Sequence, residues 1–335
     1  MRHVFHFHEG RLGSLMSANK AQEIIKRAMA DRSVYDAMAA REKEVWGGIL
    51  PDLERSEAGI EDARASGMLG IDRHTLSLIG VAVGKKLRFK HGLVLGCGAG
   101  RLERELLRWG ICESFHGIDI SEKAIAAARE IAQEEKLPLT YEVADLNSVE
   151  LPEKTFDLVA AQTTLHHILF LEHVAEQAWR SLKSDGYLWI HDLVGETQAQ
   201  YDPKRLSIMN RILAILPEKF RRNKINGQLT EIKCREPGQL CSPFEQIRSG
   251  EILPVFERWF TIEWKREFDA FLCLVIPRGT RAAYLENEDT KALFEILMLF
   301  DRLCLEEKIV RPRGGQYLMR PKSVHDLPAK NTTSG

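Results

Sequence analysis

Between Lys90 and Leu193 short apolar runs alternate with amphipathic stretches, and this alternation limits the possible folds more than any other feature. The runs predict strands, and the stretches between them have the three- and four-residue spacing of helices. Strands that alternate with helices lie parallel and are joined by right-handed crossovers, so we expect a doubly wound α/β sheet. The predicted strands are 92–95, 114–118, 140–143, 156–161 and 187–191, and the predicted helices are 101–109, 122–136 and 168–182.

The sequence on either side of this region has a different character. Apolar residues recur at helical spacing from Asn19 to about Leu87, which predicts an all-helical N-terminal part. A polar, basic stretch follows Leu193, and the tail from Ser323 is polar and expected to be loose. Between them we predict helices at 203–216, 243–259 and 289–308 and strands at 260–268 and 314–322.

Composition excludes several classes of protein. The 335 residues include 47 Lys and Arg against 48 Asp and Glu, so no global charge would draw the molecule to nucleic acid or acidic lipid. The six cysteines form no C-x-x-C pair and are too sparse for a disulfide scaffold, which favours reduced thiols in a cytoplasmic protein. No apolar run approaches the ~18 residues of a membrane helix, so we expect a protein that is neither exported nor membrane-spanning.

Three histidines, His3, His6 and His8, lie close together near the N-terminus. They could form a metal site, or they could be unoccupied side chains of a frayed terminus, and the second interpretation is the more common for such a segment. We therefore predict no metal.

Glycines 96, 98 and 100 follow a predicted strand and precede a predicted helix. A glycine-rich turn in this place presents free backbone N–H groups to a ligand and lets it approach closely, which indicates a nucleotide-like cofactor. The dinucleotide motif G-x-G-x-x-G would need glycine where Arg101 stands, so NAD is disfavoured. A phosphate loop of the G-x-x-x-x-G-K-[ST] type is also absent from this stretch.

The stretch "LVLGCGAGR" resembles the first motif of class I S-adenosylmethionine-dependent methyltransferases. Four further stretches match that family in order and spacing: "FHGIDIS" (115–121), "VADLNS" (143–148), "FDLVAAQTTLHHI" (156–168) and "LKSDGYLWIHDL" (182–193). The resemblance covers roughly residues 85–195, with weaker support over 242–322. It implies a Rossmann-like doubly wound sheet of seven strands with an antiparallel last strand, a helical N-terminal cap, and a helical insertion after strand 5.

The resemblance also implies which residues bind S-adenosylmethionine. Asp119 would accept hydrogen bonds from the ribose hydroxyls, Asp145 would accept from the adenine amino group, and Gln162 would face the methionine part. Both aspartates could instead have purely structural roles. Asp119 could cap the following helix, and Asp145 could be an ordinary turn aspartate. The full predicted cofactor set is Gly96, Cys97, Gly98, Gly100, Asp119, Ile120, Asp145, Leu146 and Gln162.

Methyl transfer from a sulfonium is an in-line displacement, so the protein mainly positions the reactants in a dry pocket. A hydroxyl acceptor needs a general base on a loop at the carboxyl ends of the strands. His166 and His167 follow the fourth strand, and His191 and Asp192 end the fifth. The histidines are the candidate bases, and each could instead be a packed histidine.

The sequence after the fourth strand also bears on the acceptor. Base-amine and glutamine methyltransferases of this family use an Asn-Pro-Pro-Tyr-like sequence there, whereas this chain has Gln162-Thr163-Thr164-Leu165, and no Pro-Cys nucleophile of a cytosine enzyme is present. The His-His sequence instead resembles the branch that methylates small molecules, sugars, lipids and quinones. The stretch 242–260 resembles bacterial methyltransferases that are thought to modify surface glycans or secondary metabolites.

Two further segments have alternative interpretations. The segment 203–224 is either a solvated face or a surface for an anionic acceptor. Its basic residues are Lys204, Arg205, Arg211, Lys219, Arg221, Arg222 and Lys224. The N-terminal helices either cover the cofactor, with Tyr35, Trp46 or Arg73 as contacts, or serve only as packing.

We expect the chain to divide into five parts: a helical cap (1–87), a cofactor-binding core (88–195), a basic helical lid (196–258), a segment that completes the sheet (259–322) and a tail (323–335). The predicted function is methyl transfer to an oxygen or nitrogen of a small molecule, sugar, or glycan or lipid precursor, and the acceptor is anionic if the basic segment 203–224 binds it. The alternatives are an RNA or protein methyltransferase and a non-catalytic partner protein with the same fold.

Overall fold

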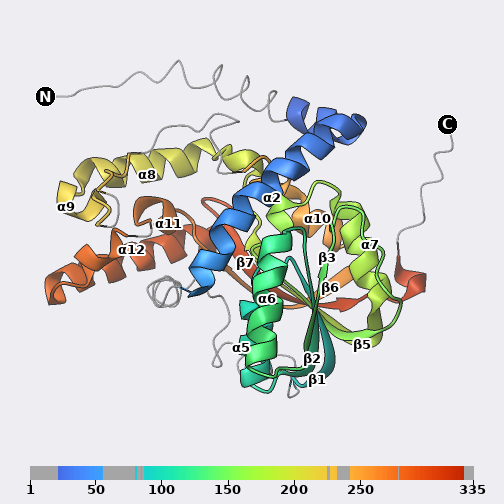
Figure 1. Cartoon of the computed structure of the whole chain (residues 1–335). Coiled ribbons are helices and arrows are strands. Elements are labelled where there is room, and N and C mark those ends of the chain that lie inside the picture. The colour runs from blue at the N-terminus through green and yellow to red at the C-terminus, as the bar shows by residue number, and fades with distance from the viewer. Residues whose placement is uncertain are drawn as a thin grey trace, which may run out of the picture.

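The structure, a computed structural model, describes residues 22–55, 80, 84, 87–224, 227–231, 242–277 and 279–327. Its centre is a seven-stranded sheet in the order β3-β2-β1-β4-β5-β7-β6 (Figure 1). Strands β1 to β5 pair in parallel, and β7 is antiparallel to both of its neighbours. The predicted doubly wound sheet with an antiparallel last strand is thereby confirmed. The strands are β1 Phe89–Leu95, β2 Cys112–Asp119, β3 Leu139–Val143, β4 Phe156–Gln162, β5 Leu182–Leu193, β6 Phe260–Phe268 and β7 Gly314–Pro321.

Helices cover both faces of the sheet, so the central strands are apolar on both sides. On one face, Leu93 and Leu95 of β1 pack with α7 (Leu171–Ser181) and α10 (Ile252–Phe256). On the other face, Val94 packs with α5 (Arg101–Arg108) and α6 (Glu122–Glu134). This explains why the strands appear in the sequence as continuous apolar runs.

The N-terminal part lies against the carboxyl ends of the strands. Residues 22–30 are helical, and α2 (Arg32–Arg55) runs beside α6, as the blue helix in Figure 1 shows. Side chains of this part, including Tyr35, form a core with Phe244, Ile247 and Leu169, which follows β4. Most of the remaining predicted cap, including His3, His6, His8 and Arg73, lies outside the described residues.

A separate helical unit is built from two distant segments of the chain. Met209 and Phe220, which precede β6, share one apolar core with Phe271 and Phe294, which follow it. The packing therefore joins part of the expected lid to part of the segment expected to complete the sheet. The helices of this unit are α8 Pro203–Ile215, α9 Glu218–Arg221, α11 Leu272–Val275, η4 Arg281–Tyr284 and α12 Glu288–Glu306.

The helix predicted at 243–259 is wrong. Residues 242–248 form turns, and only the short α10 and one 3-10 turn follow. Pro254 explains the late start, because a proline has no N–H to donate and is tolerated only in the first turn of a helix. The 3-10 turns outside the helical unit are η1 Leu165–His167, η2 Thr197–Ala199, η3 Ser249–Glu251 and η5 Val324–Asp326.

Within the described ranges, every helix is too short or too polar to cross a membrane.

Candidate cofactor and acceptor site

The glycine turn after β1 is a left-handed backbone segment. The φ angles are +66° at Gly96, +54° at Gly98 and +85° at Gly100, which L side chains rarely adopt. A Cβ atom at Gly96 would also collide with the side chain of Thr164, and one at Gly100 would collide with the Tyr141 hydroxyl. The glycines are thus required by the turn itself, and the turn places a bare stretch of backbone at the carboxyl end of β1.

Asp119 ties this turn to the end of β2. One carboxylate oxygen accepts a hydrogen bond from the Gly98 N–H at 2.9 Å, and the other accepts from the Ser121 N–H at 2.8 Å. Burial raises the pKa of Asp119, and the two N–H donors oppose that effect. Each oxygen keeps a second acceptor position, and the side chain is 8% exposed. Helix α6 is capped instead by Ser121, whose hydroxyl accepts from the Ala124 N–H.

Asp145 connects the turn after β3 to α2, the cap helix. Its Oδ1 accepts from the backbone N–H and the side-chain amide of Asn147, which makes it a turn aspartate. Its Oδ2 accepts from the hydroxyl of Tyr35, and burial together with this contact raises the pKa of Tyr35. Helix α2 therefore reaches the position that the resemblance assigns to adenine.

The other predicted cofactor residues also lie at the carboxyl ends of β1 to β4. Cys97 and Leu146 are buried among apolar side chains, so mainly their backbone remains for a ligand. Ile120 packs against the apolar core that α2 covers. Gln162 is the last residue of β4 and is partly exposed. A left-handed glycine turn beside a carboxylate with open acceptor positions fits an adenosyl group, since a ribose diol can donate to one carboxylate.

His166 is a buried histidine held by Asp192. Its Nδ1 lies 2.5 Å from Asp192 Oδ1, and Asp192 also accepts from the backbone N–H groups of Thr164 and Leu165. Burial alone would lower the pKa of His166, because it disfavours the charged ring. The adjacent Asp192 carboxylate has the larger effect, so the pKa of His166 is raised. These contacts fix the ring so that its Nε2 points away from Asp192.

His167 lies against a carboxylate of helix α2. Its Nδ1 lies 2.9 Å from Oε1 of Glu42, and the ring meets the Trp46 ring edge to face at 5.1 Å. Glu42 also accepts from the Trp46 indole N–H at 2.7 Å and from the Phe244 N–H at 3.1 Å. The cap helix thus contributes directly to the site beside β4.

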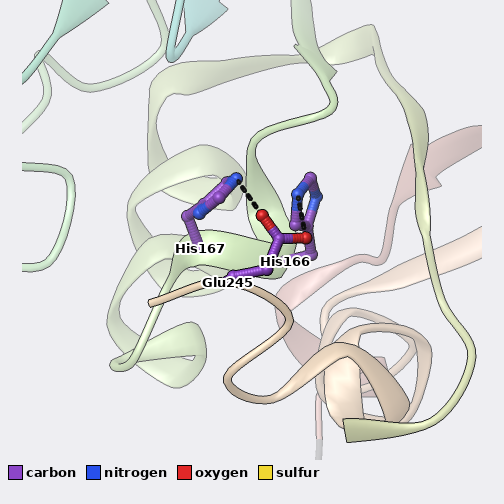
Figure 2. Close-up of side chains that lie close together, drawn as sticks. All are labelled: His166, His167 and Glu245. Atoms are coloured by element: carbon purple, nitrogen blue, oxygen red, sulfur yellow. Dashed lines mark ion pairs between the residues drawn. The ribbon is translucent and has the colours of Figure 1, made fainter. Parts of the chain in front are cut away.

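Glu245 lies between the two imidazole rings (Figure 2). One of its oxygens is 3.8 Å from His166 Nε2, and the other is 3.9 Å from His167 Nε2. The three side chains are 6%, 14% and 13% exposed, in the order His166, His167 and Glu245. This group, His166, His167 and Glu245, is called the His-His-Glu cluster below.

The third predicted base, His191, is on the opposite face of the sheet. Successive residues of a strand point to opposite faces, and the next residue, Asp192, contacts His166. The His191 ring lies between Trp189 and Phe268, and burial lowers its pKa to about 4. The structure brings His166 and His167 together and leaves His191 apart, as a weak base among aromatic rings.

The sequence did not reveal Glu42 and Glu245 as part of this site. Each is far from the histidines in sequence and has no local motif, so only the folded chain brings them together. Asp192 had a detectable signal, since it follows the apolar run of β5 at the expected edge of the sheet.

Several basic residues of 203–224 make contacts within the helical unit. Arg205 is fully buried, and its Nε lies 2.9 Å from Glu196 while a terminal nitrogen donates to the Arg311 carbonyl at 2.7 Å. Arg222 pairs with Glu218, and Lys224 pairs with Glu286. These three residues therefore provide weak support for an anion-binding entrance.

Comparisons with known proteins agree with this geometry. Residues 93–190 match a family model described as a methyltransferase domain. The ubiquinone biosynthesis O-methyltransferase of Coxiella burnetii is 27% identical over 103 residues, which are 31% of this chain and 43% of that protein. The 27-O-demethylrifamycin SV methyltransferase of Amycolatopsis mediterranei is 28% identical over 166 residues, 48% of this chain and 57% of that protein.

Among solved structures, an S-adenosylmethionine dependent methyltransferase from Mesorhizobium loti is 20% identical, with a TM-score of 0.42, over 75% of this chain and 99% of that one. The matched segments cover 43% and 57% of the two curated relatives described above, so this chain spans about half of their length.

The sheet order and the glycine turn define a class I S-adenosylmethionine-dependent methyltransferase fold. The family match places a methyltransferase domain at residues 93–190, which contain all nine predicted cofactor residues. The resemblance drawn from the sequence is confirmed for this part of the chain, and S-adenosylmethionine is the cofactor of such a domain.

Proposed function

We propose that this protein transfers a methyl group from S-adenosylmethionine to an oxygen or nitrogen of a small molecule, sugar, or glycan or lipid precursor. The observation that carries the proposal is the contact between Asp119 and the Gly98 N–H, which joins a carboxylate to a bare backbone turn at the mouth of a parallel sheet. The bound cofactor supplies the methyl group as a sulfonium. A non-catalytic partner protein would have no need of this arrangement.

The residues of this chain would bind and orient the reactants. Asp119 and the glycine turn would hold the adenosyl group, and Asp145 would share its carboxylate between Tyr35 and adenine. Helix α2 would exclude water from this end of the sheet. When the acceptor is a hydroxyl, we propose that Nε2 of His166 or His167 takes its proton, because both rings are oriented by carboxylates.

The acceptor class is proposed from two observations. The relatives described above are named for O-methylation of a quinone precursor and of a rifamycin, which favours a small-molecule oxygen. The paired basic residues of α8 and α9 give an RNA acceptor little support. A cytoplasmic location is proposed because the described cysteines, Cys97, Cys112, Cys273 and Cys304, are free thiols.

A transfer assay with methyl-labelled S-adenosylmethionine tests the proposal directly. A panel of phenols, sugars and acidic lipid precursors is compared with total RNA and protein as acceptors. Label on a small molecule supports the proposal, whereas label only on RNA or protein supports the alternative. With an acceptor identified, alanine at the true base should lower turnover by ~10²–10⁴ with little change in cofactor affinity. His191→Ala serves as the comparison and should have a smaller effect.

A further inference from the structure

The His-His-Glu cluster contains two imidazole nitrogens that face one carboxylate. The Nδ1 atom of His166 forms a hydrogen bond with Asp192, and the Nδ1 atom of His167 lies 2.9 Å from a carboxylate oxygen of Glu42. A neutral ring with its proton on Nδ1 would direct a lone pair from Nε2 toward Glu245. A lone pair that faces a carboxylate is unfavourable unless a proton or a cation lies between them.

The spacing of the cluster suits a metal ion better than direct hydrogen bonds. The two Nε2 to carboxylate separations of 3.8 and 3.9 Å exceed the range of a hydrogen bond. Two ligands about 2.1 Å from a tetrahedral ion are roughly 3.4 Å apart, so a small inward movement would complete the geometry. The ligand atoms of the three residues all lie within 4.8 Å of one another.

The surroundings have the features of a metal site beyond the three ligands. Metal-binding histidines usually donate their second ring N–H to a carboxylate, which fixes the ring and makes it a better ligand. Asp192 and Glu42 take these places, and backbone N–H groups hold both of them. Glu245 also accepts from the Gln246 side-chain amide at 3.2 Å.

The charge balance also favours a cation. Three carboxylates, Glu42, Asp192 and Glu245, surround two imidazole rings, and all five side chains are largely buried. With both rings neutral, a divalent ion would offset two of the three negative charges.

We propose that His166, His167 and Glu245 bind one divalent transition-metal ion, with Asp192 and Glu42 orienting the two histidines. Two imidazoles and one carboxylate suit Zn²⁺, Mn²⁺ or Fe²⁺ and leave coordination positions open. This inference departs from the expectation of no metal, and it does not depend on methyl transfer. A bound ion would occupy both Nε2 atoms, so the histidine base of the proposed reaction could operate only in metal-free protein.

The test measures metal binding alone. The background protein carries alanine at His3, His6 and His8, so that the N-terminal histidines cannot supply the signal. Chelator-treated protein is titrated by calorimetry with ZnCl2 and with MnCl2, and the visible spectrum is recorded with Co²⁺. We expect one ion per chain, a rise in the melting temperature, and a Co²⁺ spectrum of a site with nitrogen and oxygen ligands.

Two kinds of variant identify the site. Glu245→Gln keeps the shape of the side chain and should weaken binding by more than the ~10–100-fold expected for Asp192→Asn, which alters only an orienting residue. His116→Ala is the matched control, because His116 pairs with Glu142 at 3.4 Å in an exposed place. Melting curves without metal verify that each variant folds.

The proposal is overturned if the background protein binds neither ion, or if folded Glu245→Gln binds as tightly as its parent. In either case the three side chains pack together without a metal ion. Methyl transfer could still occur in that case, so the two proposals fail separately.

Discussion

Replacing Asp119 with asparagine should separate the roles that this residue has in the turn and in cofactor binding. The carboxylate accepts from Gly98 and Ser121, and asparagine can still accept one of these bonds through its carbonyl. Its amide group cannot accept from either the second N–H or a ribose hydroxyl. A hydrogen bond to a charged group contributes ~1.5–3 kcal/mol, so the affinity for cofactor should fall about 10- to 150-fold.

Calorimetry with S-adenosylhomocysteine measures this loss. The matched control is Asp157→Asn, because Asp157 likewise accepts a backbone N–H, from His91 at 2.9 Å, but lies near the amino end of β4. The Asp157→Asn control should bind S-adenosylhomocysteine with the affinity of the wild-type protein. Equal affinities in folded Asp119→Asn and in wild-type protein would refute the assignment of Asp119 to the ribose.

Three further predictions concern stability and are checked by urea unfolding. Tyr35→Phe removes the donor to the Asp145 carboxylate and should lower the free energy of unfolding by ~1.5–3 kcal/mol; no loss would mean that the α2 contact is not formed. Burial raises the pKa of Glu103 to about 8, so wild-type stability should fall as pH rises from about 5 to 8, because only the unfolded chain releases that proton. Glu103→Gln should reduce this fall by at least ~1 kcal/mol, and parallel pH profiles would contradict the assignment. Arg205→Met should cost ~3–5 kcal/mol by leaving Glu196 and buried carbonyls unpaired, whereas a loss below ~1 kcal/mol would indicate an exposed, ligand-facing arginine.

Much of the sheet could be predicted from the sequence because its central strands are buried on both faces. Such strands contain short apolar runs, as β1 and β4 do, whereas the edge strand β3 alternates buried and exposed residues. The turn at 96–100 was also predictable, since its glycines are required by backbone angles. The apolar strands and the glycine turn are each determined by residues that are close together in the sequence.

The rest of the site depends on contacts between distant parts of the chain. Glu42 and Glu245 reach His167 from the cap helix and from a turn before α10, and neither lies in a recognisable pattern. The helix predicted over 243–259 is reduced to α10, because Pro254 is tolerated only in the first turn of a helix. Arg205 belonged to a basic stretch in the sequence, yet folding buries it against a carboxylate.

The central claim is that the carboxyl edge of β1 and β2 binds the adenosyl group of S-adenosylmethionine. A crystal structure of the protein with S-adenosylhomocysteine tests it most directly. The account predicts both ribose hydroxyls within hydrogen-bond distance of the Asp119 carboxylate and the ligand against the backbone of residues 96–100. Ligand density elsewhere, or an Asp119 carboxylate with no contact to the ribose, would contradict it.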